Sequence, residues 1–565
     1  MEELNTERKI EDKSVSKHYQ NGLKYHNQMG FTEKWPEFER FLAGDQWPAP
    51  TERTKGLPRP VFNLISYIET HKKASVIGDA VKMIFSSEEI GEIGIDPEID
   101  IAMQGADTFT KFAETTWDRI DQDELNDELI MSASNIGTGI LHYYWDNNLT
   151  GGLTLKYKGD FEGEFLDPAN CFFGDPQCNK VQKQPYIVVA KRELVENVKA
   201  IAKDNGVPDM YIELINEDKD VNDRLYDAAK FEVEDVGKVT VLTEYFKKNG
   251  KVWFKKVCNN ILVVPETDTG LTLYPIVVMP WKKRKECIYG IGDTEGLIAN
   301  QKGVNFCLAM MLLSQQQVGW PKLLAKPGAL KQTITNTPGE VLTDYYVGDG
   351  DGIKYMNVGS FSSNAFGLVD TFINVTKDLN GANDASMGIA PGADMSAQAI
   401  ALLQKSAGVP LEDIKKHFYR CMKDVGRVWE DMWKCKYNIP RNIKVRQDGS
   451  EVMQEFKGTD YADYGMELKI DIGPASTYSE FSAQGTLDKL YDKGVIDTIK
   501  YLKYSSRNAV PFKSELIKEL QQIQNSAMGT DVTGIPGGSG EVNLMNENQL
   551  EGYGVPEVSE PNINI

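Results

Sequence analysis

Hydrophobic positions up to residue 140 repeat with the period of an α-helix. One apolar face, which ends at Gly44, consists of Trp35, Phe38, Phe41 and Leu42. The same period returns over residues 99–120 and 122–140. Pro60 suits the first turn of a helix, so we expect a helix there that carries Phe62, Ile65 and Ile68. The pattern predicts an N-terminal segment that is mainly helical.

From residue 141 to residue 280 the pattern changes to that of β-strands. Residues 141–145 and 153–157 are expected to form a hairpin around a polar turn at residues 147–152. Asn249 and Gly250 are a favoured two-residue turn between two further strand-like segments. A helical insertion is expected between residues 192 and 231. We predict one α+β domain here, completed by the N-terminal helices.

The second half of the chain has the order helix, insert, helix, loop and long helix. The pattern places these elements at residues 293–318, 319–361, 362–379, 383–395 and 396 to about 437. The insert and the loop are rich in glycine, and short strands are expected in the insert at 322–324, 340–343 and 353–356. Pro410 is expected to kink the long helix, because proline removes a backbone donor and clashes with the preceding turn.

The long helix has one continuous apolar face. Its members recur at steps of three and four and are Ile414, Phe418, Cys421, Val425, Val428 and Met432. A hairpin is expected around Asp448 and Gly449, followed by a compact helical piece at residues 477–528. Residues 529–565 contain no lysine or arginine and are rich in glycine, asparagine and glutamate, which predicts a flexible acidic tail.

Composition narrows the class of protein. A chain of 565 residues with 41% hydrophobic and 26% charged residues is expected to fold as about two to four domains. Its net charge of −21 predicts an acidic surface that does not coat nucleic acid non-specifically. The seven cysteines are scattered, which argues against a disulfide framework. No signal peptide or membrane span is expected, so we expect synthesis in a reducing cytoplasm.

The sequence lacks the common catalytic motifs. It has no P-loop, no GxSxG elbow, no HExxH pair and no CxxC pair. The five histidines are not accompanied by the carboxylates or cysteines that would complete a metal site. We therefore expect no catalytic residue, no metal ligand and no cofactor.

The densest basic cluster of the chain consists of Lys282, Lys283, Arg284 and Lys285. Such a cluster is expected to face DNA phosphates or an acidic partner. A solvated strand end before a helix accounts for the same residues, because four charges are a short run. The sequence leaves both interpretations open.

Several motifs, taken in their order along the chain, resemble those of tailed-bacteriophage portal proteins. They are FLAGDQW at residues 41–47 with PRPVFNLI at 58–65, YGIGD at 289–293 with Asn300, Gln301 and Asn305, SAQAIALLQ at 396–404, and residues 487–496 with 510–517. The motifs at residues 41–47 and 58–65 resemble the N-terminal region of that family, and those at 289–305 resemble the run into its first stem helix. The motif at 396–404 resembles the junction of tunnel loop and long helix, and residues 487–496 and 510–517 resemble the C-terminal helical region.

The resemblance implies an α+β portal-type subunit with a wing, a two-helix stem, a clip, a long kinked helix and a helical crown. On this chain the N-terminal helices and wing would lie at 1–292, the first stem helix at 293–318, the clip at 319–361 and the second stem helix at 362–382. The tunnel loop would follow at 383–395, the long kinked helix and a wing hairpin at 396–476, the crown at 477–528 and the tail at 529–565. The tunnel loop would bring Asn383, Asp384, Ser386, Met387, Ile389, Asp394 and Met395 to a DNA channel. The clip would present Lys322, Lys326, Lys331, Glu340 and Asp344 to terminase or to an adaptor.

The resemblance also implies a structural role in the virion and no enzymatic activity. It implies a ring, usually of twelve copies, at one capsid vertex, assembled in the cytoplasm of a host bacterium. The implied partners are further copies of the chain, double-stranded DNA passing through the channel during packaging and ejection, the terminase large subunit, head-completion or adaptor proteins, and the major capsid and scaffolding proteins, with no membrane. Two alternatives stay open, another head-tail adaptor or tail structural protein and a soluble hydrolase with dispersed carboxylates.

Overall fold

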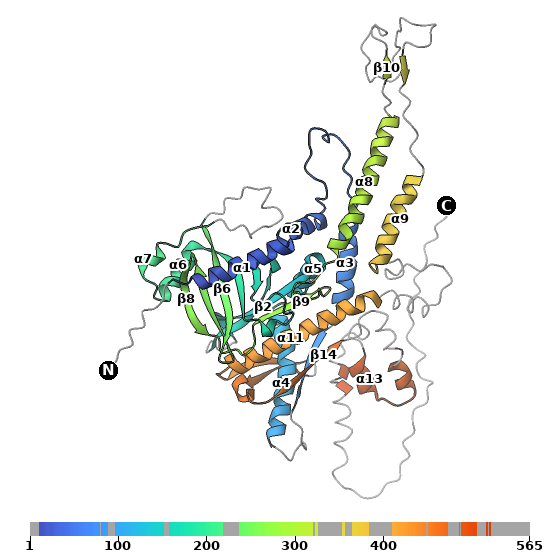
Figure 1. Cartoon of the computed structure of the whole chain (residues 1–565). Helices are drawn as coiled ribbons and strands as arrows, with labels where there is room; N and C mark the ends of the chain where they lie inside the picture. The colour runs from blue at the N-terminus through green and yellow to red at the C-terminus, as the bar shows by residue number, and fades with distance from the viewer. Residues whose placement is uncertain are drawn as a thin grey trace, which may run out of the picture. The chain divides into compact units, whose positions relative to one another are not determined.

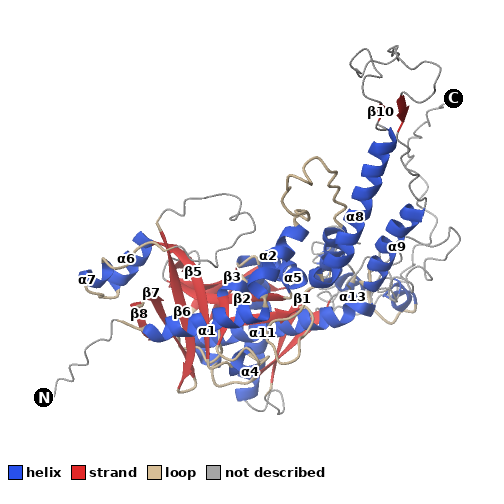
Figure 2. Ribbon diagram, turned by 45° about the horizontal axis from the view of Figure 1, so that its top comes forward, coloured by secondary structure: helices blue, strands red, loops and turns tan. Residues whose placement is uncertain are grey.

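The computed structural model describes most of the chain up to residue 472 and short segments beyond it. The described residues are 11–78, 81–88, 97–151, 157–218, 237–319, 323–325, 353–355, 364–382, 409–447, 450–472, 485, 487–505, 516–517 and 519–520. The chain divides into two compact units, Met1–Ser482 and Ala483–Ile565. Helices and sheets occur together in the first unit, as Figure 2 shows, which confirms the α+β class.

Three helices open the described chain: α1 (Lys13–Met29), α2 (Phe31–Leu42) and α3 (Leu64–Ile77). Gly30 separates α1 from α2 with a left-handed φ of 72°, a conformation that glycine takes without strain. The predicted apolar face of α2 is confirmed, since Trp35, Phe38 and Phe41 are buried.

Helix α3 begins later than predicted. Its N-cap residue is Asn63, whose side chain accepts a hydrogen bond from the backbone N of Ser66 at 3.1 Å. Pro60 therefore lies before the helix, and Phe62 is exposed rather than part of its apolar face. An asparagine cap satisfies a donor of the first turn, which explains why the helix begins here and not at the proline.

Helices α4 (Pro97–Arg119) and α5 (Gln122–Ile136) confirm two of the predicted helical segments. Between α3 and α4 the chain forms strand β1 (Val81–Ser87), in a segment for which the sequence predicts mainly helix. This strand pairs antiparallel with β14 (Met466–Ile472). The preference for a strand depends on its neighbours, and here the neighbour lies far along the chain, so the local sequence gives no signal.

A three-stranded antiparallel sheet has the order β3 (Tyr157–Leu166), β2 (Thr138–Gly151) and β9 (Ile276–Pro280). The predicted hairpin is wrong in its turn, because β2 continues through residues 147–151 and Thr150 pairs with Lys158. The register shifts between Asp146 and Thr150. Such an irregularity leaves residues of β2 unpaired and bends the strand locally.

The second sheet has five antiparallel strands in the order of the sequence. They are β4 (Cys171–Phe173), β5 (Tyr186–Leu194), β6 (Lys238–Lys248), β7 (Lys251–Cys258) and β8 (Ile261–Asp268). The predicted turn at Asn249 and Gly250 is confirmed, with positive φ at both residues. Helices α6 (Val195–Asp204) and α7 (Asp209–Ile212) lie within the predicted helical insertion, of which residues 219–236 are outside the described part.

Helices α8 (Thr294–Gly319) and α9 (Asn364–Leu379) lie side by side and run antiparallel (Figure 1). The Asn300 side chain on α8 donates a hydrogen bond to Thr376 Oγ1 on α9 at 3.0 Å. Helices are thus present in both segments for which the sequence predicts them. Short strands β10 (Leu323–Ala325) and β11 (Ile353–Tyr355) pair antiparallel within the predicted insert.

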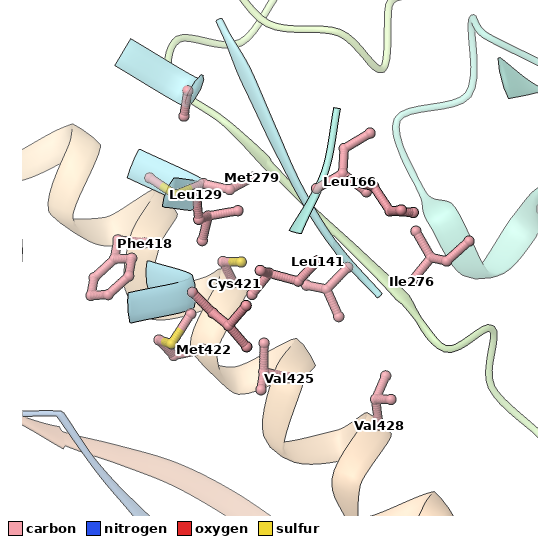
Figure 3. Packing of buried hydrophobic residues seen from close by; sticks show 14 of the residues in the cluster. Leu129, Leu141, Leu166, Ile276, Met279, Phe418, Cys421, Met422, Val425 and Val428 are labelled. Atoms are coloured by element: carbon pink, nitrogen blue, oxygen red, sulfur yellow. The ribbon is translucent and has the colours of Figure 1, made fainter. Parts of the chain in front are cut away.

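Helix α11 (Glu412–Lys436) buries its apolar face in the main core. The predicted members of this face, Ile414, Phe418, Cys421, Val425, Val428 and Met432, are all buried, which confirms it. Figure 3 shows side chains of α11 in one cluster with Leu141 of β2 and with Ile276 and Met279 of β9. Each large side chain buried in this way contributes about 1.5–3 kcal/mol, so the face holds α11 firmly to the sheet.

Pro410 lies in a short 3-10 turn, Val409–Leu411, directly before α11. Residues 396–408, which the sequence predicts to be the first part of the long helix, lie outside the described residues. The kink at Pro410 therefore stays a prediction.

The remaining elements of the first unit follow α11. Strands β12 (Arg441–Gln447) and β13 (Ser450–Phe456) form the hairpin that the sequence predicts, with Gln447 paired to Ser450. Short 3-10 turns lie at Pro168–Asn170, Val181–Lys183 and Gly458–Tyr461. In the second unit the structure describes helix α13 (Thr498–Tyr504), and the predicted tail at 529–565 lies outside the described residues.

Candidate functional site

Side chains from distant parts of the sequence meet around the first turns of α8, in a region that we call the α8 seat. Its members are Gln46, Asn63, Glu69, Lys72, Ser134, Lys282, Asp293, Thr294, Gln301 and Asn305. Three of the segments that carry the sequence motifs, residues 41–47, 58–65 and 289–305, all contribute to it. The structure therefore brings these motifs together in space.

Four side-chain amides form one network in the α8 seat. Asn305 Nδ2 donates to Gln46 Oε1 at 2.6 Å, and Gln46 Nε2 donates to Asn63 Oδ1 at 3.1 Å. Gln301 Nε2 donates to Asn305 Oδ1 at 3.0 Å. Gln46, Gln301 and Asn305 are buried, so the two bonds among these three residues form away from competing water. The network joins the loop before α3 to the side of α8.

Gln301 also acts on the backbone of the loop. Its Oε1 accepts a hydrogen bond from the backbone N of Leu64 at 2.9 Å, and its Nε2 donates to the carbonyl oxygen of Phe62 at 2.6 Å. The first N–H groups of a helix have no partner within the helix. A side chain of α8 therefore caps the first turn of α3.

Two glycines of the YGIGD motif allow a close approach of two backbones. A Cβ at Gly290 would lie 2.3 Å from the carbonyl oxygen of Gly137, and a Cβ at Gly292 would lie 2.2 Å from that of Asn135. The backbone N of Asp293 donates to the carbonyl oxygen of Ser134 at 2.7 Å. The motif thus packs against the end of α5, which is the reason for glycine at both positions.

Asp293, directly before α8, is the charged centre of the α8 seat. Its carboxylate accepts hydrogen bonds from Lys72 Nζ at 2.7 Å, from Lys282 Nζ at 2.6 Å and from Trp281 Nε1 at 2.7 Å. Burial alone would raise the pKa of Asp293, but the two ammonium groups outweigh it and hold the pKa below its ordinary value. The carboxylate is fully buried and its charge is compensated.

Glu69 of α3 is a second buried carboxyl group in the α8 seat. The Thr294 hydroxyl donates to its Oε1, and the Ser134 hydroxyl lies 3.1 Å from its Oε2. Burial raises the pKa of Glu69 to about 7, and the nearby charge of Asp293 acts in the same direction. Glu69 connects α3 with the first residue of α8 and with α5.

Lys72 links the α8 seat to the end of α9. Besides its bond to Asp293, Lys72 Nζ lies 3.4 Å from the side-chain oxygen of Asn380, the residue that follows α9. The side-chain nitrogen of Asn380 donates to the Thr376 carbonyl oxygen at 2.8 Å. One ammonium group thus contacts the start of α8 and the end of α9.

The basic cluster does not form a single positive patch. Lys282 contacts the buried Asp293, and Arg284 lies 3.6 Å from Glu295 and against the ring of Phe31. Lys283 and Lys285 are exposed. Lys285 also lies 3.8 Å from Glu286. Acidic groups of the same chain therefore contact three of the four charges, which weakens the interpretation that all four face DNA or a partner.

One side of the α8–α9 pair is apolar and exposed. Asn300 and Gly303 of α8 face α9. An α-helix advances about 100° per residue, so Phe306 lies roughly a quarter turn from the middle of this contact and Met310 roughly an eighth of a turn, in the same direction. On α9, the exposed Leu368, Val375 and Leu379 form a second apolar stripe, which is turned by a similar angle from the side of α9 that faces α8. Because the helices are antiparallel, both stripes lie on the same side of the pair. We call this surface the α8–α9 apolar face, with the members Phe306, Met310, Leu368, Val375 and Leu379.

The α8–α9 apolar face is well exposed in the single chain. Leu379 is 77% exposed and Phe306 is 61% exposed. Phe306 also borders a cavity of about 640 Å³ together with Trp47 and Lys302. Large contiguous apolar surfaces are uncommon on proteins that act as monomers and mark sites of association.

Most of the other predicted site residues lie outside the described residues. These are Lys322, Lys326, Lys331, Glu340 and Asp344 of the predicted clip and Asn383, Asp384, Ser386, Met387, Ile389, Asp394 and Met395 of the predicted tunnel loop. Their proposed roles stay predictions.

A cleft of about 540 Å³ lies between the two sheets and contains a histidine–carboxylate pair. His142 Nδ1 lies 2.6 Å from Glu164, and His142 Nε2 lies 2.9 Å from the Tyr245 hydroxyl. Burial lowers the pKa of His142 and raises that of Tyr245, so a neutral imidazole accepts from the phenol and donates to the carboxylate. Both ring nitrogens of His142 are therefore occupied by hydrogen bonds within the chain.

The described residues give no sign of a metal site or a membrane helix. Within this part of the chain, no group of three or more histidine, cysteine or acidic side chains is arranged to hold a metal ion. No helix in the same residues is both long enough and apolar enough to cross a bilayer.

Sequence reasoning missed Glu69, Lys72 and Ser134 as members of the α8 seat. Glu69 and Lys72 lie three residues apart on α3 and share a helix face with the apolar Ile65. Charged residues on an apolar helix face are the one signal that marks them. Charged residues are seldom fully buried, so that signal is usually read as a solvated face.

Residues 32–478 of the chain match the model of a protein family that is described as phage P22-like portal protein. The matched segment includes the α8 seat, the α8–α9 pair and α11. No curated protein matches the chain.

Proposed function

The chain belongs to the phage P22-like portal protein family, and we propose that it forms the portal ring at one capsid vertex, through which double-stranded DNA enters and leaves the virion. The family is structural rather than enzymatic, and its members are parts of the phage head. The α8–α9 apolar face is the observation in this chain that best supports a ring.

A second copy of the chain is the occupant that we propose for the α8–α9 apolar face. Five large apolar side chains exposed along two neighbouring helices are unfavourable in water and favour association. In a ring, each copy uses two different surfaces, one toward each neighbour, and the contacts close on themselves. The α8–α9 pair would then be the two-helix stem, with neighbouring stems packed around the channel.

The parts of the subunit follow from this proposal. Residues 1–292 would form the N-terminal helices and wing, 293–318 and 362–382 the stem, and 319–361 the clip. Residues 383–395 would form the tunnel loop, 396–476 the long kinked helix and wing hairpin, 477–528 the crown and 529–565 an acidic tail. The pairing of β10 with β11 supports a compact β-containing clip at the end of the stem.

DNA would move through the channel without tight binding. The net charge of −21 disfavours strong attraction to phosphates, and a conduit for sliding DNA needs weak contacts. The predicted tunnel loop contains Asp384, Met387, Ile389 and Met395, which offer no strong grip on phosphate. Of the basic cluster, we propose that the exposed Lys283 and Lys285 face DNA or a partner, since the contact of Lys285 with Glu286 is itself exposed.

The proposed partners belong to the assembly of a phage head. The clip, with Lys322, Lys326, Lys331, Glu340 and Asp344, would contact the terminase large subunit during packaging and head-completion or adaptor proteins afterwards. The wing and crown would contact major capsid and scaffolding proteins. We place the protein at the portal vertex of the virion, after assembly of about twelve copies in the bacterial cytoplasm.

Single-particle measurement of mass and symmetry tests the ring. Twelve copies of the 63.3-kDa chain make particles of about 760 kDa with an axial hole and closed cyclic symmetry. A different closed ring would correct the number of copies and keep the proposal. A monomer or dimer that persists at high concentration, and with scaffolding protein added, would overturn it.

A further inference from the structure

The hydrogen bonds around Glu69 are arranged for a carboxylic acid rather than for a carboxylate. The Ser134 hydroxyl oxygen lies 3.1 Å from Glu69 Oε2 and 3.0 Å from the carbonyl oxygen of Met131. A hydroxyl has one hydrogen and cannot donate to both oxygens. If Glu69 Oε2 carries a proton, it donates to Ser134, and Ser134 donates to Met131. Both short contacts are then hydrogen bonds.

Charged groups face Glu69 from several elements. Asp293 before α8 and Glu39 of α2 are acidic, and each raises the pKa of Glu69. Lys72 of α3 and Lys282 after β9 are basic, but their ammonium groups lie 2.7 and 2.6 Å from Asp293. An ionised Glu69 would therefore be a second buried carboxylate beside Asp293, whose negative charge opposes the ionisation of Glu69.

The position of Glu69 makes its charge matter for α8. Glu69 Oε1 accepts from the hydroxyl of Thr294, the first residue of α8, and the rest of the carboxyl group faces α5. The side chain is 5% exposed, so water does not screen a change of charge there.

We propose that Glu69 is a proton-operated switch in the α8 seat, whose neutral form holds the start of α8 against α3 and α5 and whose ionised form weakens that hold. The step breaks the O–H bond at Oε2 and releases the proton to water. Ser134 must then turn its hydrogen from Met131 toward Glu69. Since burial raises the pKa of Glu69 to about 7, the change falls near neutral pH. The switch is a property of the chain itself, and its action on a stem helix rests on the proposed function.

Hydrogen exchange of the full-length protein tests the switch. Protection of residues 294–305 is measured at about pH 6 and about pH 8 and corrected for the intrinsic pH dependence of exchange. We expect residues 294–305 of the wild type to exchange roughly tenfold faster at the higher pH. At about pH 6, one unit below the pKa of Glu69, the bound proton favours the closed state by a factor of about ten, and at about pH 8 this contribution is lost. Glu69→Gln, whose amide donates to Ser134 without titrating, is expected to remain protected at both. Equal pH dependence in the wild type and the variant would overturn the proposal.

Glu295→Gln is the matched control, since it removes a carboxylate from the first turn of α8 that is partly exposed and pairs with Lys34 and Arg284. It is expected to keep the pH dependence of the wild type, and loss of that dependence would overturn the role of Glu69.

If Glu69→Gln does not fold, infrared spectra of the wild type and of Ser134→Ala follow the C=O stretch of the protonated acid. A band that titrates near neutral pH and shifts in Ser134→Ala supports the switch, and no such band at about pH 6 overturns it. Because neither readout needs a ring, failure of the switch and failure of the portal proposal are distinguishable.

Discussion

Gln301 on α8 accepts a hydrogen bond from the backbone N of Leu64 at 2.9 Å and thereby caps α3. Asn63 supplies the neighbouring cap to the backbone N of Ser66. One cap is local, and the other comes from a helix that begins more than two hundred residues later, since the two bonded residues are 237 positions apart. The start of α3 is therefore complete only when α8 is in place.

Gln301→Ala is expected to lower the free energy of unfolding by about 1–3 kcal/mol, because it leaves the Leu64 N–H and the Phe62 carbonyl without their partner. Urea unfolding of the variant and the wild type measures the difference. Gln315→Ala is the control, at an exposed position on the same helix, and should stay within about 0.5 kcal/mol. Equal losses from both variants would contradict the capping role.

Asp293→Asn is expected to destabilise the protein by about 3–5 kcal/mol, because it leaves the ammonium group of Lys72 buried without its counter-ion. Chemical denaturation measures the loss. Glu295→Gln breaks the partly exposed contacts with Lys34 and Arg284 and should cost at most about 1 kcal/mol. A small effect of Asp293→Asn would mean that water reaches Lys72.

The stability of the wild type is expected to fall as the pH rises from about 4.5 to about 7. The pKa of Glu69 is about 7 in the folded protein and about 4.5 when unfolded, so the folded state binds more protons in this window. The contribution of Glu69 to the free energy of unfolding is fully present below the pKa of the unfolded state. It falls by about 3 kcal/mol as the pH rises through the pKa of the folded state. Denaturation curves across this range, with Glu69→Gln as reference, isolate the effect. A difference between the two proteins that does not change with pH would contradict it.

Gly292→Ala is expected to destabilise the protein by about 1–3 kcal/mol, because the new Cβ would lie 2.2 Å from a backbone oxygen that cannot move freely. Gly296→Ala adds the same methyl group four residues later, where nothing lies within 4 Å, and should be neutral or stabilising by about 0.5–1 kcal/mol. Thermal unfolding of both variants checks the contrast.

Leu379→Lys is expected to weaken association without weakening the single chain. The side chain is 77% exposed, so its replacement should change the stability of the monomer by no more than about 0.5 kcal/mol. A lysine at an apolar contact between copies should instead shift the population toward smaller species in analytical ultracentrifugation. Asn374→Lys, on an exposed polar position of α9, adds the same charge off the apolar face and should assemble as the wild type does.

The long helices could be predicted from the sequence because their apolar faces repeat locally. The members of the α11 face are all buried as predicted, and helices occupy both segments expected to flank the insert. The turn at Asn249 and Gly250 could also be predicted, since positive φ at two adjacent positions restricts the residues that fit.

Elements that depend on distant partners could not be predicted. Strand β1 has its partner in β14, and β2 continues past a polar segment because β3 pairs with it there. The sequence motifs marked Gln301 and Asn305 as notable, but the bonds from Gln301 to Leu64 and from Asn305 to Gln46 depend on three-dimensional packing. The spacing of Glu69 and Lys72 on α3 gave only a weak signal, and the raised pKa of Glu69 could not be predicted, because it is set by burial that only the fold creates.

The amide network also has a consequence for the order in which the chain folds during synthesis. Asn305 and Gln46 are 259 residues apart, and ribosomes add about 5–20 residues per second, so Gln46 waits on the order of tens of seconds for its partner. During that time Gln46 Oε1 and the Phe62 carbonyl oxygen lack the partners on α8 that they have in the complete chain. An N-terminal fragment that ends before residue 293 would expose this unfinished surface permanently, and we expect it to aggregate or be degraded where the full chain folds.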